Sequence, residues 1–337
     1  MACVFLPVLT GVAVTNYVVD PGDVYRKRYV DKIIEGHGKD LHVTNVPDNI
    51  DDRTYKLKLC ELNKNKSFDI LVIGNSRLLT ISSDMFPHSS VLNLALASGK
   101  LEDYVAFYQI CKHNNIHYDK VFFCADPPTL FNENFQETRW KNIEEYYYGF
   151  LNQEKGFDID FSRFENLFSL SYFQTAVKEK KSKDMAFVNT PVNKGKTYRK
   201  DGSLNYKRAV REMSLEAIDG MARTEMLSMF NDFESLSEER KQLFDTLIQT
   251  FKKDGVEVLF FRSPYHPIFY KRIENIQGMK EGMEYMENYA KDNHIQMIGH
   301  FNPVEDSLSN KDFYDHVHPR SETMERLIMK YLSNEKK

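Results

Sequence analysis

Five short apolar runs alternate with segments of helical periodicity, and this alternation constrains the fold more than any other feature of the sequence. The runs lie at 68–73, 91–95, 120–125, 256–261 and 295–298. Apolar side chains recur at helical spacing near 101–113, 236–253, 278–292 and 320–333. Continuous apolar strands that alternate with helices indicate a parallel sheet with right-handed crossovers. We therefore predict an α/β protein with a doubly wound core of five parallel strands.

The alternation is interrupted after the third strand. Residues 130–235 are rich in aromatic and charged side chains, are mostly helical in character, and show no strand pattern. We interpret them as an insertion in a core domain that covers 66–335. The polar segment 22–65 is interpreted as a linker or extension in front of that domain.

Composition excludes several classes of protein. The 45 Lys and Arg residues nearly balance the 49 Asp and Glu residues, and the formal charge is −4, so the sequence does not favour a nucleic-acid partner. The four cysteines lack any C-x-x-C spacing, which argues against a zinc site and against a dense disulfide framework. An aromatic share of 13% is typical of a folded chain rather than a disordered one.

The N-terminal segment 2–19 contains no charged side chain and ends at Asp20-Pro21-Gly22. Because a membrane-spanning helix needs about 20 apolar residues, this segment is just long enough to act as a membrane anchor. It lacks the basic region and cleavage site of a removable signal peptide. A buried N-terminal helix is the alternative. The basic run 26–28 follows the segment, which by the positive-inside rule argues against export of the body.

Ser76 follows the first core strand, two residues after Gly74. Ligands of open parallel sheets bind beyond the carboxyl ends of the strands, where this serine is expected. Its hydroxyl would be exposed, and its own N–H would lie at a helix start and could stabilise an oxyanion. The same pattern also makes ordinary helix caps, so Ser76 is either a nucleophile or a cap.

Asp315 and His318 stand immediately before the last predicted helix. A turn with this spacing can bring the Asp315 carboxylate to Nδ1 of His318, which leaves Nε2 free as a general base. His316 is a less suitable base, because its immediate neighbour Asp315 would orient it poorly. An ordinary surface turn is the alternative. The predicted topology brings Ser76 and this turn to the same sheet edge.

At these residues the chain resembles the SGNH/GDSL hydrolase superfamily, and in particular a membrane-anchored branch that acts on cell-surface polymers. The resemblance covers roughly 66–330 and implies a three-layer α/β/α, flavodoxin-like fold. Gly74-Asn75-Ser76-Arg77 matches the first block, 93–99 is similar to the second, and Asp315 with His318 matches the fifth. The resemblance implies Ser76 as nucleophile, the Gly99 amide as oxyanion donor, and no metal or organic cofactor. Residues 16–21 are similar to anchored members, whose catalytic domain lies outside the cytoplasm.

The chain departs from this pattern at two positions. Asn75 stands where many members carry Asp, and the third block, which should offer Gly-x-Asn-Asp, reads Ala125-Asp126-Pro127-Pro128. Asp126 thus occupies the place of the third oxyanion donor, although an ionised carboxylate cannot donate. Loss of one such donor can lower a rate about 10²- to 10³-fold. Asn132 or Asn134 could replace it, and Arg77 could supply positive charge or face solvent.

Three further clusters allow two interpretations each. The aromatic run 140–150 could stack on sugars or pack in the core, and the basic run 194–203 could contact an anionic polymer or form a solvated loop. His266, after the fourth strand, is expected to line the cleft, either as a substrate-binding residue or as part of the loop.

The sequence therefore predicts a serine esterase or O-acyltransferase that acts on acyl groups of a cell-envelope glycan. It would be anchored in the membrane, with the catalytic domain periplasmic or extracellular. One alternative is a catalytically silent domain that binds a polysaccharide or an assembly partner of the envelope. The other is a soluble cytoplasmic esterase whose N-terminal helix is buried.

Overall fold

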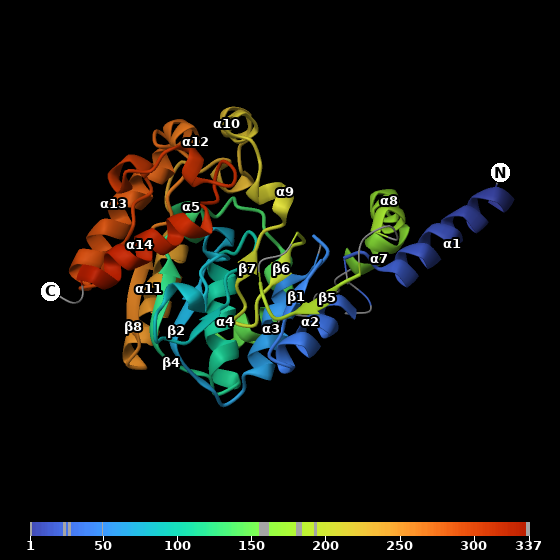
Figure 1. The fold of residues 1–337 in the computed structure, drawn as a ribbon, viewed down its shortest axis with the longest axis horizontal. Coiled ribbons are helices and arrows are strands. Elements are labelled where there is room, and N and C mark those ends of the chain that lie inside the picture. The colour runs from blue at the N-terminus through green and yellow to red at the C-terminus, as the bar shows by residue number, and fades with distance from the viewer. Residues whose placement is uncertain are drawn as a thin grey trace.

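The core of the protein is a parallel five-stranded sheet with the strand order β3-β2-β4-β8-β9 (Figure 1). The computed structural model describes residues 2–22, 25, 28–48, 50–154, 162–179, 184–191 and 194–334. The strands of the sheet are β2 (Ser67–Ile73), β3 (Val91–Asn93), β4 (His117–Cys124), β8 (Glu257–Phe261) and β9 (Gln296–Ile298). All five predicted strands are confirmed. The first core strand lies between the second and the third, which is the flavodoxin-like order of a doubly wound sheet.

The four predicted crossover and terminal helices are also confirmed. They are α4 (Leu101–His113), α11 (Glu238–Lys253), α13 (Gln277–Asp292) and α14 (Ser321–Asn334). Shorter helices connect the other elements: α2 (Arg28–Gly38), α3 (Asp52–Leu62), α5 (Pro127–Phe131), α6 (Glu144–Phe150), α9 (Arg208–Arg211), α10 (Leu215–Thr224) and α12 (Pro267–Ile273). The segment 22–65, predicted as a linker or extension, contains α2 and α3 where the structure describes it.

Neighbouring aromatic residues of β4 show how the layers are built. Successive strand residues face opposite sides of a sheet. The Phe122 ring contacts Tyr331 of α14 at 6.1 Å between centroids, and the Phe123 ring contacts Phe244 of α11 at 5.8 Å. Phe123 also contacts Tyr104 of α4, at 5.3 Å. Helix α14 therefore covers one face of the sheet, and α4 and α11 cover the other, which makes the three-layer α/β/α arrangement.

The prediction of an insertion without strands was wrong. A second, antiparallel sheet in the order β5-β1-β6-β7 joins β1 (His42–Thr44) of the extension to β5 (Ala186–Val188), β6 (Thr197–Tyr198) and β7 (Leu204–Asn205) of the insertion. These strands are two or three residues long, too short for an alternating pattern to appear in the sequence. β1, which pairs with both β5 and β6, lies more than 140 residues upstream of them, so only the tertiary fold brings these strands together.

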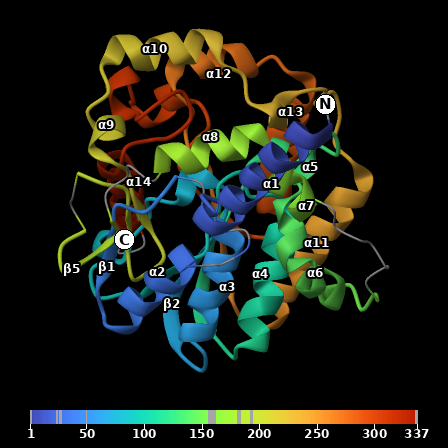
Figure 2. The same cartoon turned by 90° about the vertical axis from the view of Figure 1, so that its right-hand side faces the viewer.

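The N-terminal helix α1 (Ala2–Val19) projects from the body together with α7 (Ser162–Phe168) and α8 (Leu170–Glu179), and the C-terminal end lies on the opposite side (Figure 1). Figure 2 shows α8 crossing beside α1 in the end-on view. Asn16 is buried, and its amide donates to the carbonyls of Asn166, Leu167 and Ser169 at 2.9–3.0 Å. Within the described residues, no helix combines the length and the apolar character that crossing a membrane requires.

Candidate active site

A sharp turn after β2 presents Ser76 at the carboxyl edge of the sheet. A Cβ atom on Gly74 would lie 2.6 Å from Cβ of Cys124 in the neighbouring strand β4, so only glycine fits at the start of this turn. Asn75 then caps the one-turn 3₁₀ helix Ser76–Leu78, because its side-chain oxygen accepts the N–H of Arg77 at 3.1 Å. Ser76 is therefore the first residue of a helical turn, and its side chain stands clear of the sheet.

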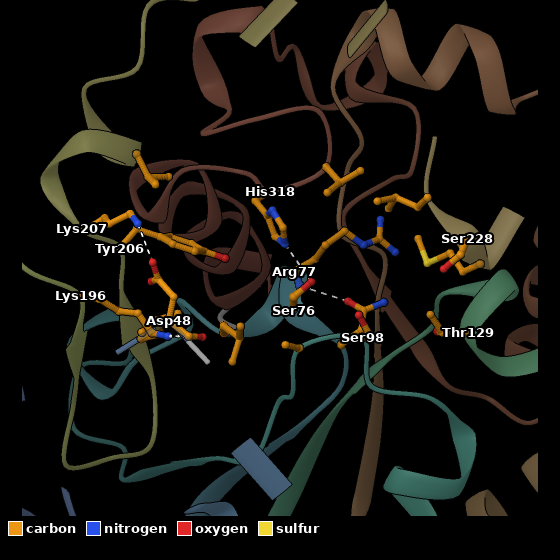
Figure 3. Close-up of a pocket in the computed structure, with 18 of the residues that line it drawn as sticks. Asp48, Ser76, Arg77, Ser98, Thr129, Lys196, Tyr206, Lys207, Ser228 and His318 are labelled. Atoms are coloured by element: carbon orange, nitrogen blue, oxygen red, sulfur yellow. Dashed lines mark hydrogen bonds and ion pairs between the residues drawn. The ribbon is translucent and has the colours of Figure 1, made fainter. Parts of the chain in front are cut away.

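Ser76, His318 and Asp315 form a continuous hydrogen-bonded chain (Figure 3). Nε2 of His318 lies 2.8 Å from Oγ of Ser76, and Nδ1 lies 2.7 Å from Oδ2 of Asp315. The other carboxylate oxygen, Oδ1, accepts the backbone N–H groups of Val317 and His318 at 2.8 and 2.9 Å. Ser76, which follows the first core strand, is thus within hydrogen-bonding distance of the predicted Asp315–His318 pair, which precedes the last helix.

The surroundings of Asp315 keep this carboxyl group ionised. Burial alone would raise its pKa, but the charge and hydrogen bond of His318, with the two backbone N–H donors, outweigh burial and hold the pKa well below its usual value. The ionised carboxylate of Asp315 accepts a hydrogen bond from the Nδ1–H group of His318. In the neutral imidazole, Nε2 then carries no proton and can act as an acceptor. This is the tautomer that can take a proton from the Ser76 hydroxyl.

Two backbone N–H groups near Ser76 are available to a ligand. Among the described residues, neither the N–H of Ser76 nor that of Ser98 has a hydrogen-bond partner. Ser98 lines the cavity and has a φ of +51°, a left-handed conformation that non-glycine residues rarely adopt. Gly99, the residue that the resemblance implied, does not line the cavity, and its N–H donates to the carbonyl of Leu96 at 3.3 Å. The cavity-lining residue whose N–H has no partner is therefore Ser98, one position before the expected Gly99.

Buried charges from α3 hold the loop that carries Ser98. Arg53 donates to the carbonyl of Ala97 at 2.8 Å, and Oδ2 of Asp52 accepts the N–H of Ala97 at 2.6 Å. Arg53 is itself fixed by Asp103 of α4, at 2.8 and 3.0 Å. Asp52 and Arg53 were not predicted as site residues, because they lie in the polar extension and form no recognisable motif.

Asp126 lies beneath the turn and does not face the cavity. It is fully buried and accepts the side chains of Asn75 and Tyr265, each at 2.7 Å, and it forms an ion pair with Arg77. The structure therefore does not bring Asp126 to the place of an oxyanion donor, because its oxygens are occupied by these three partners. Instead, Asp126 braces the residues on both sides of Ser76.

Arg77 is buried, so the alternative that it faces solvent was wrong. Its guanidinium lies 4.0 Å from the centre of the Tyr265 ring and donates to the carbonyl of Ser263 at 2.8 Å. Part of Arg77 also lines the cavity, and its charge is balanced by Asp126.

Several other residues predicted for the site do not line the cavity at Ser76. His266 is fully buried at the start of α12, where its Nδ1 accepts the N–H of Ile268 at 3.3 Å, and it does not line the cavity. His316 packs on the Phe269 ring at 5.0 Å between centroids. The amide of Asn132 donates to the carbonyls of Met229 and Asn231, and that of Asn134 to Asp232, so neither replaces the missing third donor.

The aromatic run 140–150 does not reach the cavity through the rings described below, whereas the basic run 194–203 does. Trp140 packs edge-to-face on Tyr147 at 5.1 Å, and neither ring lines the cavity. The basic run contributes β6 to the second sheet, and Lys196 reaches the cavity from it. The insertion therefore supplies one wall of the site through this run.

Ser76 and His318 open into a cavity of about 470 Å³, which is within the usual range for small-molecule sites. About half of its lining residues are apolar or aromatic, and about half come from the insertion. Lining residues include Leu79, Ala97, Phe135, Leu204, Tyr206, Val210, Leu227, Met229 and Val317. Within the described part of the chain, no group of three His, Cys, Asp or Glu side chains is arranged to hold a metal ion.

No protein-family model matches the sequence, and no curated protein matches it. Among solved structures, the chain is similar to a Bacteroides fragilis protein described as a "putative acylhydrolase". The two are 12% identical, the match covers 84% of this chain and 96% of the other, and the TM-score is 0.38. So distant a likeness bears on neither substrate nor mechanism.

Proposed function

We propose that this protein is a serine-dependent acyl-ester hydrolase or O-acyltransferase of SGNH type, with Ser76 as nucleophile. The observation that carries the proposal is the hydrogen-bonded chain from Asp315 through His318 to Ser76, which opens into a cavity. A surface turn or a helix cap has no need of this alignment.

In the proposed reaction, Oγ of Ser76 attacks the ester carbonyl while Nε2 of His318 takes the hydroxyl proton. The resulting oxyanion accepts hydrogen bonds from the N–H groups of Ser76 and Ser98. The bond to the leaving alcohol then breaks, and His318 returns its proton to the alcohol oxygen. Water, or a hydroxyl group of an acceptor, releases the acyl group from Ser76 by the same steps in reverse. Asp315 stays ionised throughout and maintains the tautomer of His318.

The natural substrate is proposed to be an acylated glycan of the cell envelope, as the sequence resemblance implies. We further propose attachment to a membrane through α1, with the catalytic domain outside the cytoplasm. Exposed apolar side chains support this attachment, since Val8, Val14, Tyr17 and Val18 of α1 are each at least half exposed. Membrane fractionation of the full chain tests the attachment, and protease treatment of intact cells tests the location of the catalytic domain.

The first experiment compares hydrolysis of p-nitrophenyl acetate by the wild type and by Ser76→Ala. We expect the variant to lose turnover to the background rate while its thermal unfolding midpoint stays within a few degrees. Turnover that survives in Ser76→Ala would exclude the serine mechanism. A serine-reactive phosphonate gives a second measurement, because its label should appear on Ser76 and disappear in His318→Ala. Absence of both turnover and labelling in correctly folded protein would favour the silent binding domain.

A further inference from the structure

The cavity extends to both sides of Ser76, and the two sides differ in charge. Figure 3 shows Asp48, Lys196 and Lys207 on one side of Ser76, and Thr129 and Ser228 on the other. An ester bound at Ser76 also has two sides, an acyl part and an alcohol part. The charged side of the cavity must therefore face one of them.

The position of His318 indicates which part this is. His318 returns a proton to the oxygen of the leaving alcohol, so that oxygen has to lie near Nε2. The Tyr206 ring lies 5.8 Å from the His318 ring, and Lys207 follows Tyr206 in the chain. Ser98, whose N–H would hold the oxyanion, lies on the other side of Ser76 (Figure 3). The alcohol part would thus extend toward Lys207.

The charged side chains that line this end of the cavity are two lysines and one aspartate. Lys207 pairs with Asp48 at 2.7 Å. Lys196 donates to the backbone carbonyls of Pro47 and Asp48 at 3.2 and 3.4 Å, and no described carboxylate lies within ion-pair distance of it. Lys196 therefore has no ion pair of its own among the described residues. The Lys207–Asp48 pair is largely solvent-exposed, and such pairs are weak, so an incoming anion can displace Asp48.

We infer that the alcohol part of the natural substrate carries an anionic group, a carboxylate or a phosphate, which binds between Lys196 and Lys207. This inference rests on the proposed serine mechanism, and it assigns to the basic run 194–203 and to the start of α9 a role in substrate selection. The remaining apolar wall of the cavity, including Leu227 and Met229, would face the acyl part.

A matched pair of substrates tests the charge preference. The acetyl ester of 4-hydroxybenzoate has an anionic alcohol part, and that of 4-hydroxybenzamide has a neutral one of similar size. We expect the wild type to favour the anionic ester by about five- to tenfold in kcat/KM, in line with two partly exposed charge contacts. Replacement of both lysines, in Lys196→Met/Lys207→Met, should remove this preference, so that kcat/KM for the anionic ester falls to that of the neutral ester in the same variant.

Two further variants separate binding from structural effects. Lys200→Met changes an exposed lysine of the same basic run that pairs with Asp40 and does not line the cavity, so the preference should persist. Asp48→Asn removes the competing carboxylate and should increase the preference. A preference that is unchanged in the double lysine variant, or that falls in Asp48→Asn, would overturn the inference.

A binding measurement keeps this test independent of the proposed reaction. In Ser76→Ala, titration of 4-hydroxybenzoate and 4-hydroxybenzamide, followed by NMR, measures the affinity for each alcohol part without turnover. Tighter binding of the benzoate that is lost in the double lysine background supports the anionic subsite even if neither ester is hydrolysed. Equal affinities would exclude the subsite. Failure of the serine mechanism would instead appear as turnover that does not depend on Ser76.

Discussion

Replacement of Asp315 by Asn tests the proposed mechanism at the residue that orients the general base. The oxygen Oδ1 of Asp315 accepts two backbone N–H groups, those of Val317 and His318. An asparagine must keep its single oxygen at this position, because its NH₂ group cannot face two donors. The NH₂ group is then directed at Nδ1 of His318 and donates to it. The neutral imidazole has to carry its proton on Nε2, where it can no longer accept the proton of Ser76.

We therefore expect Asp315→Asn to lose about 10³- to 10⁴-fold in kcat, or about 4–5.5 kcal/mol of transition-state stabilisation. The assay is hydrolysis of p-nitrophenyl acetate at neutral pH, with Ser76→Ala as the background rate. The unfolding midpoint should change little, because both backbone N–H groups keep their acceptor.

Asp312→Asn is the matched control for this variant. Asp312 is three residues away in the same loop and accepts the N–H and hydroxyl groups of Ser309, but it does not line the cavity. Its replacement should leave kcat within about threefold of the wild type, since no group at Ser76 changes. An Asp315→Asn protein that is folded and retains more than a tenth of the wild-type rate would refute the tautomer argument.

Two predictions concern stability. Gly74→Ala places a methyl group 2.6 Å from Cβ of Cys124, so urea unfolding should show a loss of about 1–3 kcal/mol together with lower turnover, whereas Gly149→Ala, in α6 with open space around it, should not destabilise the protein. Burial lowers the pKa of His37 to about 4. Because the unfolded chain binds this proton below about pH 6.5 and the folded chain only below about 4, stability should fall by about 3 kcal/mol as the pH drops through this window. His37→Gln should flatten the fall, and an equally steep fall in this variant would contradict the assignment.

The sequence by itself determined the core sheet and the candidate triad. Each central strand is a continuous apolar run of its own, so its identity depends on local composition and not on its partners. Glycine at position 74 and the Asp-x-x-His spacing are local features as well, and doubly wound topology brings their chain positions to one edge of the sheet.

Only the tertiary structure decided what surrounds Ser76. The second sheet joins β1 to strands more than 140 residues away, and the charges that hold the Ala97–Ser98 loop come from α3. Asp126 has a structural position beneath the turn because Asn75, Arg77 and Tyr265 all bind its carboxylate. Such contacts depend on where distant segments pack, and no periodicity or spacing in the chain records them. The turn that carries Ser76 is determined by neighbouring residues in the sequence, whereas the walls of the cavity are determined by the packing of distant segments.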